Sequence, residues 1–189
     1  MAVDVEGNGQ RPPDLVEAAC VPVDSGEPGN MRNWLVRPPQ PITAAAARIH
    51  RISNREVAAA PSVGEVAEQI RAALDGRVLV GHHAGIDMGV LSRQLGWRPD
   101  AVLDTLWLAK RMWPALHSYR LDALADRARL PGVPDIAGRR HRAGHDAILT
   151  AGLFLALARA ADPHGTLSAG RLVRLARPRP AGPDDPALF

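Results

Sequence analysis

MAVDVE at residues 1–6 and LVEAACVPV at residues 15–23 are two apolar stretches, separated by the turn-rich connection GNGQRPPD. Valine-rich runs bounded by glycine and proline are typical of strands, and a connection this short makes the strands antiparallel neighbours. NWLV at residues 33–36 predicts a third strand with a similarly short link. The N-terminal part of the chain therefore predicts an antiparallel sheet.

Helical and strand patterns alternate after these three strands. We predict further strands over residues 77–82 and 101–105, and helices over residues 42–52, 62–74, 84–95, 106–113, 120–130 and 143–160. Ser62 and Glu65 have the spacing of a capping box at the start of one helix. Strands followed by alternating strands and helices predict an α/β sheet with helices packed on it.

The length of 189 residues suits one domain with a short tail, and 46% of the residues are hydrophobic, enough for an ordinary core. After Asp162 the chain becomes rich in proline and arginine and poor in apolar residues. Such a composition does not bury enough apolar surface to order itself. We therefore expect a domain over residues 1–161 and a flexible tail over residues 162–189.

Composition also bears on the compartment. Cys20 is the single cysteine, so no internal disulfide forms and a reducing compartment is indicated. The N-terminus carries acids where a signal peptide needs a basic start, and no run of 18 apolar residues occurs. We expect a cytoplasmic protein without a membrane partner, whose true start could lie upstream of Met1. The net charge of +3 permits a nucleic-acid partner but does not require one.

Carboxylates occur at two positions where ligands gather in such folds. Asp4 and Glu6 are two apart in a predicted strand, so they share a face, where a divalent cation would relieve their repulsion. Asp87 follows the strand at residues 77–82, in GHHAGID, near the carboxyl edge of the sheet. When each is taken alone, a solvated strand end for Asp4 and Glu6, and a favourable helix start for Asp87, are the simpler explanations.

His141 and Asp146 lie in HRAGHDA, where the last long helix is predicted to begin. Their spacing brings them together if His141 is on the turn that precedes the helix and Asp146 is within it. A polar helix start is the alternative for this motif alone. His141 and His145 also have an i, i+4 spacing that suits zinc, but no further zinc ligands accompany them.

Taken together, the three motifs AVDVEGNG, GHHAGID and HRAGHDA resemble, in order and spacing, the DEDDh (DnaQ-like) family of 3′→5′ exonucleases. This family includes the proofreading epsilon subunit of bacterial DNA polymerase III, oligoribonuclease and ribonuclease T. The resemblance covers roughly residues 2–160. It implies a ribonuclease H-like fold, with a mixed five-stranded sheet flanked by helices.

The resemblance also implies a chemistry. Asp4, Glu6, Asp87 and Asp146 would hold two Mg²⁺ or Mn²⁺ ions, and His141 would be the general base. Water would attack the terminal phosphodiester of a single-stranded 3′ end, preferably of DNA, and release a nucleoside 5′-monophosphate. The alternatives are a 3′→5′ exoribonuclease for short RNA and a non-catalytic nucleic-acid-binding module of the same fold.

Some residues around the motifs depart from the family pattern or suggest substrate contacts. Ile86 replaces the usual aromatic residue and His83 the usual asparagine, while Gly7, Asn8 and Gly9 stand where Thr-Thr-Gly is common. We expect these three residues and His83 to contact the substrate. Arg142, like Arg139 and Arg140, flanks His141 and is a candidate for the nucleic-acid backbone, or alternatively part of a solvated basic turn.

The end of the chain, DPALF, loosely resembles the short peptide by which bacterial replication proteins dock on the sliding clamp. In this interpretation, an extended tail would insert two large apolar side chains, here Leu188 and Phe189, into a preformed groove. An ordinary terminus is the alternative. A DNA polymerase or a sliding clamp is therefore an expected partner in addition to single-stranded 3′ ends.

Overall fold

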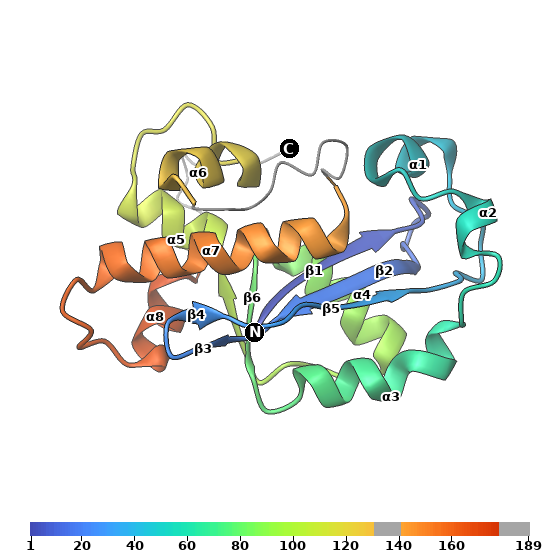
Figure 1. Ribbon diagram of the computed structural model, residues 1–189, viewed down its shortest axis with the longest axis horizontal. Helices are drawn as coiled ribbons and strands as arrows, with labels where there is room; N and C mark the ends of the chain where they lie inside the picture. Colours follow the sequence, from blue (N-terminus) through green and yellow to red (C-terminus); the bar gives the residue numbers. More distant parts are fainter. Residues whose placement is uncertain (131–140, 178–189) are drawn as a thin grey trace, which may run out of the picture.

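A five-stranded mixed sheet forms the centre of the computed structural model, which describes residues 1–130 and 141–177 (Figure 1). Its strands, in spatial order, are β5 (Arg32–Leu35), β2 (Leu15–Val21), β1 (Ala2–Gly7), β6 (Val78–Gly81) and β7 (Ala101–Asp104). β1, β2 and β5 pair antiparallel, whereas β1, β6 and β7 pair parallel. The predicted α/β fold and its antiparallel first three strands are confirmed.

Helices cover both faces of this sheet. They are α1 (Ala44–His50), α2 (Asn54–Val57), α3 (Val63–Leu74), α4 (Gly85–Leu95), α5 (Thr105–Met112), α6 (Leu121–Ala128), α7 (Ala143–Ala161) and α8 (Ala169–Leu175). α7 crosses one face of the sheet, and α3 and α4 lie on the other (Figure 1). α1 and α2 lie beyond the end at which β1 finishes (Figure 1).

The alternation of side chains along β1 and β2 explains how the two faces differ. Val3 packs with Ala18 and Cys20 in the core beneath α3 and α4. Their neighbours Ala2, Ala19 and Val21 pack instead against α7. Because side chains two apart in a strand share a face, Asp4 and Glu6 lie on the α7 side with Ala2.

α7 meets the sheet through small side chains. Ala143, Ala147 and Ala151 recur every fourth residue on one face of the helix and are fully buried against the sheet. A side chain on the adjacent Gly144 would approach the Met31 sulfur to 2.7 Å. We call Ala143, Ala147 and Ala151 the alanine seam; their small size lets the helix axis lie close to the sheet.

Most predicted elements are present, and Glu65 accepts the Ser62 backbone N–H at 2.7 Å, as the capping box requires. Two features were not predicted from the sequence. One is a two-stranded hairpin, β3 (Val23–Asp24) and β4 (Glu27–Pro28), and the other is the helix α2. These elements are two to four residues long. Such lengths are too short for a hydrophobic period to show.

α8 corrects the expected flexible tail. Leu172, Val173, Leu175 and Ala176 line one side of a short helix, and Val173 and Ala176 are buried in the core that includes β7, α5 and α7. Four apolar residues at helical spacing were enough for docking on a ready apolar surface, despite the surrounding arginines. The boundary at residue 161 stays a prediction, and the expected clamp-binding residues 185–189 lie outside the described residues.

Over residues 1–130 and 141–177, none of the helices has the length and apolar character that crossing a lipid bilayer requires.

Candidate active site

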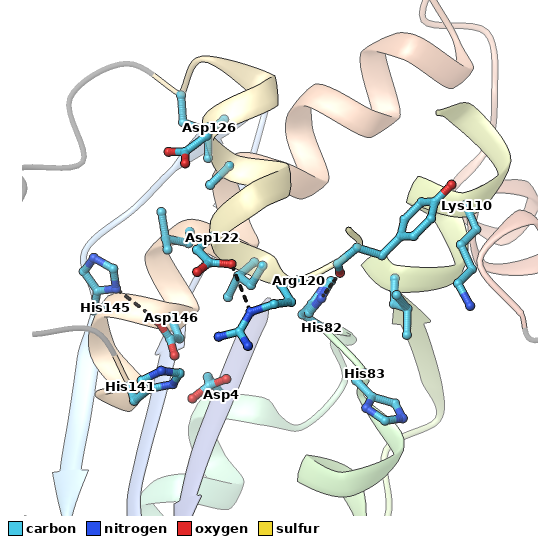
Figure 2. Close-up of a pocket in the computed structure, with 16 residues that line it drawn as sticks. Asp4, His82, His83, Lys110, Arg120, Asp122, Asp126, His141, His145 and Asp146 are labelled. Carbon is cyan, nitrogen blue, oxygen red and sulfur yellow. Dashed lines mark hydrogen bonds and ion pairs between the residues drawn. The ribbon is translucent and has the colours of Figure 1, made fainter. Parts of the chain in front are cut away.

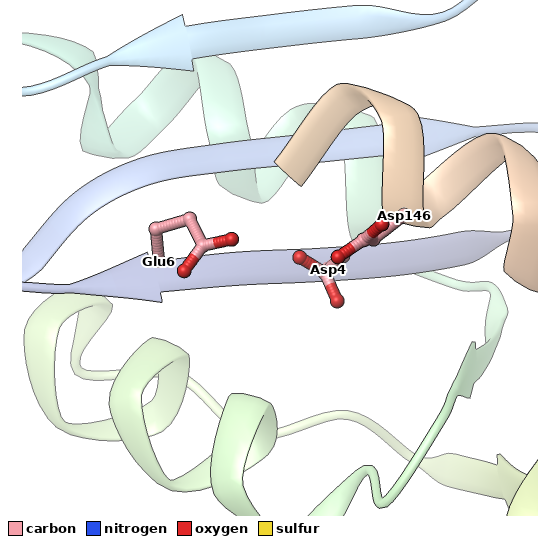
Figure 3. Close-up of side chains that lie close together, drawn as sticks. All are labelled: Asp4, Glu6 and Asp146. Atoms are coloured by element: carbon pink, nitrogen blue, oxygen red, sulfur yellow. The ribbon is translucent and has the colours of Figure 1, made fainter. Parts of the chain in front are cut away.

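Three of the four predicted metal ligands meet at the α7 side of the sheet (Figure 3). Asp4 and Glu6 come from β1, and Asp146 from the first turn of α7. One carboxylate oxygen of each lies within 4.8 Å of the others. The meeting depends on the close approach of α7 to the sheet, because Asp146 precedes Ala147 of the alanine seam.

Asp87, the fourth predicted ligand, lies in the first turn of α4 and is 7% exposed. It is outside the group of three, but its charge is close enough to act on Asp4. Its Oδ2 atom is buried and has no hydrogen-bond partner among the described residues. A buried, unpartnered carboxylate oxygen is costly, so this atom suits a ligand that the side chains themselves do not supply.

The electrostatics of the group show how strongly these carboxylates repel one another. Burial raises the pKa of Asp4 well above its usual range, and the charges of Asp87 and Asp146 raise it further. Burial and the charge of Asp146 raise the pKa of Glu6 to about 8. Burial, followed by Asp104 and Asp146, raises the pKa of Asp87. Without a cation, part of this group therefore holds protons near neutral pH.

The donor set fits a hard divalent cation. All the side chains offer oxygen, which Mg²⁺ and Mn²⁺ prefer, and neither cysteine nor a histidine belongs to the group of three. A cation would relieve the repulsion and satisfy the unpartnered oxygen of Asp87. The zinc alternative finds no support here, because the described groupings of possible ligands contain neither His141 nor His145.

His141 and His145 have different environments. His141 is exposed, precedes α7 in the left-handed backbone region at φ 60°, and lines the cavity next to Asp146. The His145 side chain is 13% exposed, and its Nδ1 lies 3.0 Å from Oδ1 of Asp146. The His145 imidazole therefore contacts a candidate metal ligand.

A cavity of about 940 Å³ opens from Asp4 and Asp146 toward α5 and α6 (Figure 2). Its walls combine the candidate catalytic residues with side chains from α5, α6 and the loops beside them. They are Asp4, His82, His83, Leu106, Lys110, Tyr119, Arg120, Leu121, Asp122, Ala125, Asp126, Leu130, His141, His145, Asp146 and Leu149. The carboxylates therefore lie at one end of an open cavity large enough for an extended ligand.

Glu17 on β2 fixes the start of α7. Its carboxylate is 1% exposed and accepts two bonds from Arg142, at 2.8 and 3.0 Å, one from the backbone of Ala143 at 2.9 Å and one from Asn33 at 3.0 Å. Burial alone would raise the pKa of Glu17, but these bonds lower it below its usual value. Glu17 is also the cross-strand neighbour of Glu6.

Arg142 therefore has a different role from the one expected. Its guanidinium is hydrogen-bonded to Glu17, and one of its nitrogens lies 3.5 Å from a carboxylate oxygen of Glu56 in α2. The expected contact with the nucleic-acid backbone gives way to an internal pair that anchors the residues between His141 and Asp146. Arg139 and Arg140, the other arginines of this motif, lie outside the described residues.

Asp104 plays a comparable part for the second motif. From the end of β7, its carboxylate accepts the backbone N–H groups of His83 and Ala84, both at 3.0 Å, and of Leu106 at 2.9 Å. It thus caps α5 and at the same time holds the loop that leads into α4 and Asp87. His83 adopts φ 62° in this loop and lines the cavity, where it stays a candidate for substrate contact.

The Gly7–Gly9 loop is explained by packing. Asn8 is fully buried, and its amide bonds Asp14, the Gln40 carbonyl and the backbone N–H groups of Gln10 and Asp14. The expectation that Asn8 contacts the substrate is wrong, because all four of its hydrogen-bonding positions are used internally. At Gly9, with φ 77°, a side chain would collide with Oγ1 of Thr43 at 2.3 Å.

Sequence reasoning missed Glu17 and Asp104. A signal for Glu17 was available, because it is the one carboxylate within the apolar run LVEAACV, and a buried carboxylate needs partners. Asp104 carried the weaker signal of an N-cap residue between a strand and a helix. The partners of both lie far along the chain, so the sequence alone did not identify them.

Comparisons with known proteins agree with this geometry. A family model described as Exonuclease matches residues 1–154. The DNA polymerase III subunit epsilon-like protein of Rhodobacter capsulatus is 34% identical over 166 residues, which is 85% of this chain and 23% of that protein. Exodeoxyribonuclease 10 of Escherichia coli is 33% identical over 141 residues, which is 75% of this chain and 60% of that protein. The chain thus spans less than two thirds of either relative.

Solved structures confirm the ribonuclease H-like fold. A structure of exonuclease X in complex with 5′ overhanging duplex DNA has 30% identity and a TM-score of 0.76, covering 93% of this chain and 98% of that chain. A complex of E. coli exonuclease I with a dT13 oligonucleotide has 18% identity and a TM-score of 0.69, covering 86% of this chain and 41% of that chain. The second likeness concerns the fold alone.

Proposed function

This chain belongs to the exonuclease family, and from that premise we propose that it removes nucleotides from single-stranded 3′ ends, with DNA preferred over RNA. The observation that carries the proposal is the carboxylate group of Asp4, Glu6 and Asp146, of which Asp4 and Asp146 line one end of the cavity. The DNA preference is supported by the relative described as an exodeoxyribonuclease and by the DNA bound in the exonuclease X structure.

The family depends on divalent metals, and in this chain Asp4, Glu6, Asp87 and Asp146 would hold two Mg²⁺ or Mn²⁺ ions. When bound, such ions lower the pKa of a water molecule and neutralise phosphate charge. His141 would accept the proton of the attacking water, from its exposed position beside Asp146 at the mouth of the cavity. Glu17 and Asp104 would keep the two ligand-bearing helices in place.

The test is digestion of three matched substrates: single-stranded DNA, duplex DNA with a mismatched 3′ end, and short RNA, each with Mg²⁺ and with Mn²⁺. Strands labelled at the 5′ end should shorten one nucleotide at a time, and 5′-mononucleotides should accumulate. Faster digestion of short RNA than of DNA would replace the DNA preference with the exoribonuclease alternative. Binding without any digestion would favour the non-catalytic module.

Variants of the ligands assign the activity to this site. Asp4→Ala and Asp146→Ala should each remove nearly all digestion while the protein stays folded, because losing one of several repelling carboxylates does not destabilise a metal-free protein. Asp24→Ala is the matched control and should keep wild-type digestion. Asp24 lies in β3, away from the carboxylate group, and forms an exposed ion pair with Arg77. Near wild-type turnover in either ligand variant, with intact folding, would reject the assignment.

A further inference from the structure

Lys110 on α5 lines the cavity on the side opposite the carboxylates Asp4 and Asp146 (Figure 2). Its ammonium nitrogen lies 4.5 Å from the centre of the Trp107 ring and 5.8 Å from that of Tyr119. Aromatic faces attract a cation but do not neutralise it. The two aromatic rings therefore hold the lysine in position.

Among the described residues that line the cavity, Lys110 and Arg120 carry permanent positive charges, and the two differ in their partners. Arg120 lies 3.5 Å from Asp122, which takes up part of its charge. Lys110 forms no ion pair with a carboxylate anywhere in residues 1–130 and 141–177. A positioned ammonium without an anion, in the wall of a cavity, suits an anionic group of the ligand.

The ring beside Lys110 is itself fixed. The Tyr119 hydroxyl donates to the Trp113 carbonyl at 2.8 Å and accepts the Leu116 N–H at 3.3 Å. The Tyr119 carbonyl accepts a bond from Nε2 of His82 at 2.9 Å, which ties this turn to the end of β6. The position of Lys110 relative to the second motif is therefore set by contacts that do not involve the substrate.

The surroundings of the carboxylates indicate which part of a strand reaches Lys110. On the side of α1 and α2, Asn8 is buried, the Gly9 loop packs on Thr43, and Arg142 approaches Glu56. The cavity extends instead toward α5 and α6, whose side chains line it. A 3′ terminal nucleotide suits the more closed side, and the rest of the strand then leaves through the cavity, past Lys110.

We propose that Lys110 binds an internucleotide phosphate on the 5′ side of the scissile bond, so that efficient digestion requires a strand longer than a dinucleotide. This inference rests on the proposed exonuclease function and deepens it. A dinucleotide without a 5′ phosphate contains the scissile phosphate only and has nothing to offer Lys110. A longer strand gains one charge-assisted contact once the relevant phosphate is present.

The experiment measures kcat/KM for unphosphorylated DNA strands of two to six nucleotides. In the wild-type protein, kcat/KM should rise roughly 10-fold or more at one length, as expected for a hydrogen bond to a charged group. In Lys110→Met this step should vanish, with the dinucleotide rate unchanged, and Lys110→Arg should restore it. The salt dependence of KM for the longest strand should become shallower by about 0.7 in log–log slope, the loss of one single-strand phosphate contact.

Two controls make the outcome specific. Arg159→Met removes the same charge from the exposed last turn of α7, outside the cavity, and should keep the length step. A neutral methylphosphonate at the identified phosphate should slow the wild-type protein and leave Lys110→Met unaffected. Equal length profiles for Lys110→Met and the wild type, or an equal loss at every length including two, would overturn the inference. Digestion of no strand by the wild type would overturn both the inference and the proposed function.

Discussion

Among single residues, His141 and His145 separate two roles that the sequence leaves close together. His141 is exposed and lines the cavity, whereas His145 is held against Asp146. His141→Ala should lower kcat by roughly 10²–10⁴-fold and leave KM nearly unchanged, the effect expected of a lost general base. Steady-state kinetics on a labelled single strand measures both constants.

His145→Ala is the internal control for that prediction. Because His145 contacts Asp146 and orients it, the variant should keep most of its kcat at saturating Mg²⁺ and require more Mg²⁺ to reach it. If His145→Ala were the inactive protein and His141→Ala nearly normal, the general base would have been assigned to the wrong histidine.

Among the helices and strands, α7 begins where the Glu17 carboxylate holds Arg142 and the backbone N–H of Ala143; we call these contacts the Glu17 clamp. Glu17→Gln keeps the size of the side chain but removes the charge that holds Arg142 and offers the Ala143 N–H a poorer acceptor. We expect kcat to fall roughly 10- to 100-fold, as for other residues that orient metal ligands, with little change in KM. The free energy of unfolding should fall by up to about 3 kcal/mol, because a buried ion pair loses one partner.

Kinetic measurements well below the measured melting temperature of each variant separate an effect on the position of Asp146 from an effect on folding stability. Arg77→Gln breaks the exposed pair with Asp24 and should change neither kcat nor the melting temperature appreciably. A Glu17→Gln protein that melts earlier yet keeps wild-type kcat would show that the clamp serves folding alone.

The sequence predicted most helices and strands but not which polar side chains are used inside the fold. The alternation in β1 placed Asp4 and Glu6 on one face, and the capping box at Ser62 marked the start of α3, because both signals are local. Arg142 and Asn8 were misjudged because each is satisfied by partners, Glu17 and Asp14 among them, that only the folded chain brings near. Local pattern predicts an element; it does not tell which polar side chains the fold itself uses.

At the scale of the whole molecule, the carboxylate group links stability to pH. The pKa of Glu6 is raised from 4.5 to about 8, so in this interval the folded protein retains a proton that the unfolded chain releases. The folded state then binds more protons than the unfolded state, and stability falls as pH rises. Asp4 and Asp87 act in the same direction.

Thermal melts in EDTA between pH 6.5 and 8 test this prediction. Burial lowers the pKa of His50 and His82, which opposes the trend only below about pH 6.5, where unfolded histidines gain protons. Burial also lowers the pKa of the Met1 amino group, which opposes the trend just below pH 8, but the three carboxylates outweigh this one group. The melting temperature should therefore decrease across the chosen interval, less steeply in Glu6→Gln. Mg²⁺ or Mn²⁺ should raise it, and more so at pH 8 than at pH 6.5. A melting temperature that rises with pH in EDTA, or that neither Mg²⁺ nor Mn²⁺ changes, would contradict this link between the carboxylate group and stability.

The alanine seam limits which substitutions can accumulate in this protein during evolution. Asp146 reaches Asp4 because Ala143, Ala147 and Ala151 keep the helix close to the sheet. A bulkier residue at Ala147 would lift the helix and part the carboxylates without altering any charged group. Lineages that descend from this sequence are thus held to small residues at positions that take no part in chemistry. In a saturation mutagenesis screen, Ala147 should tolerate almost as few replacements as the aspartate beside it.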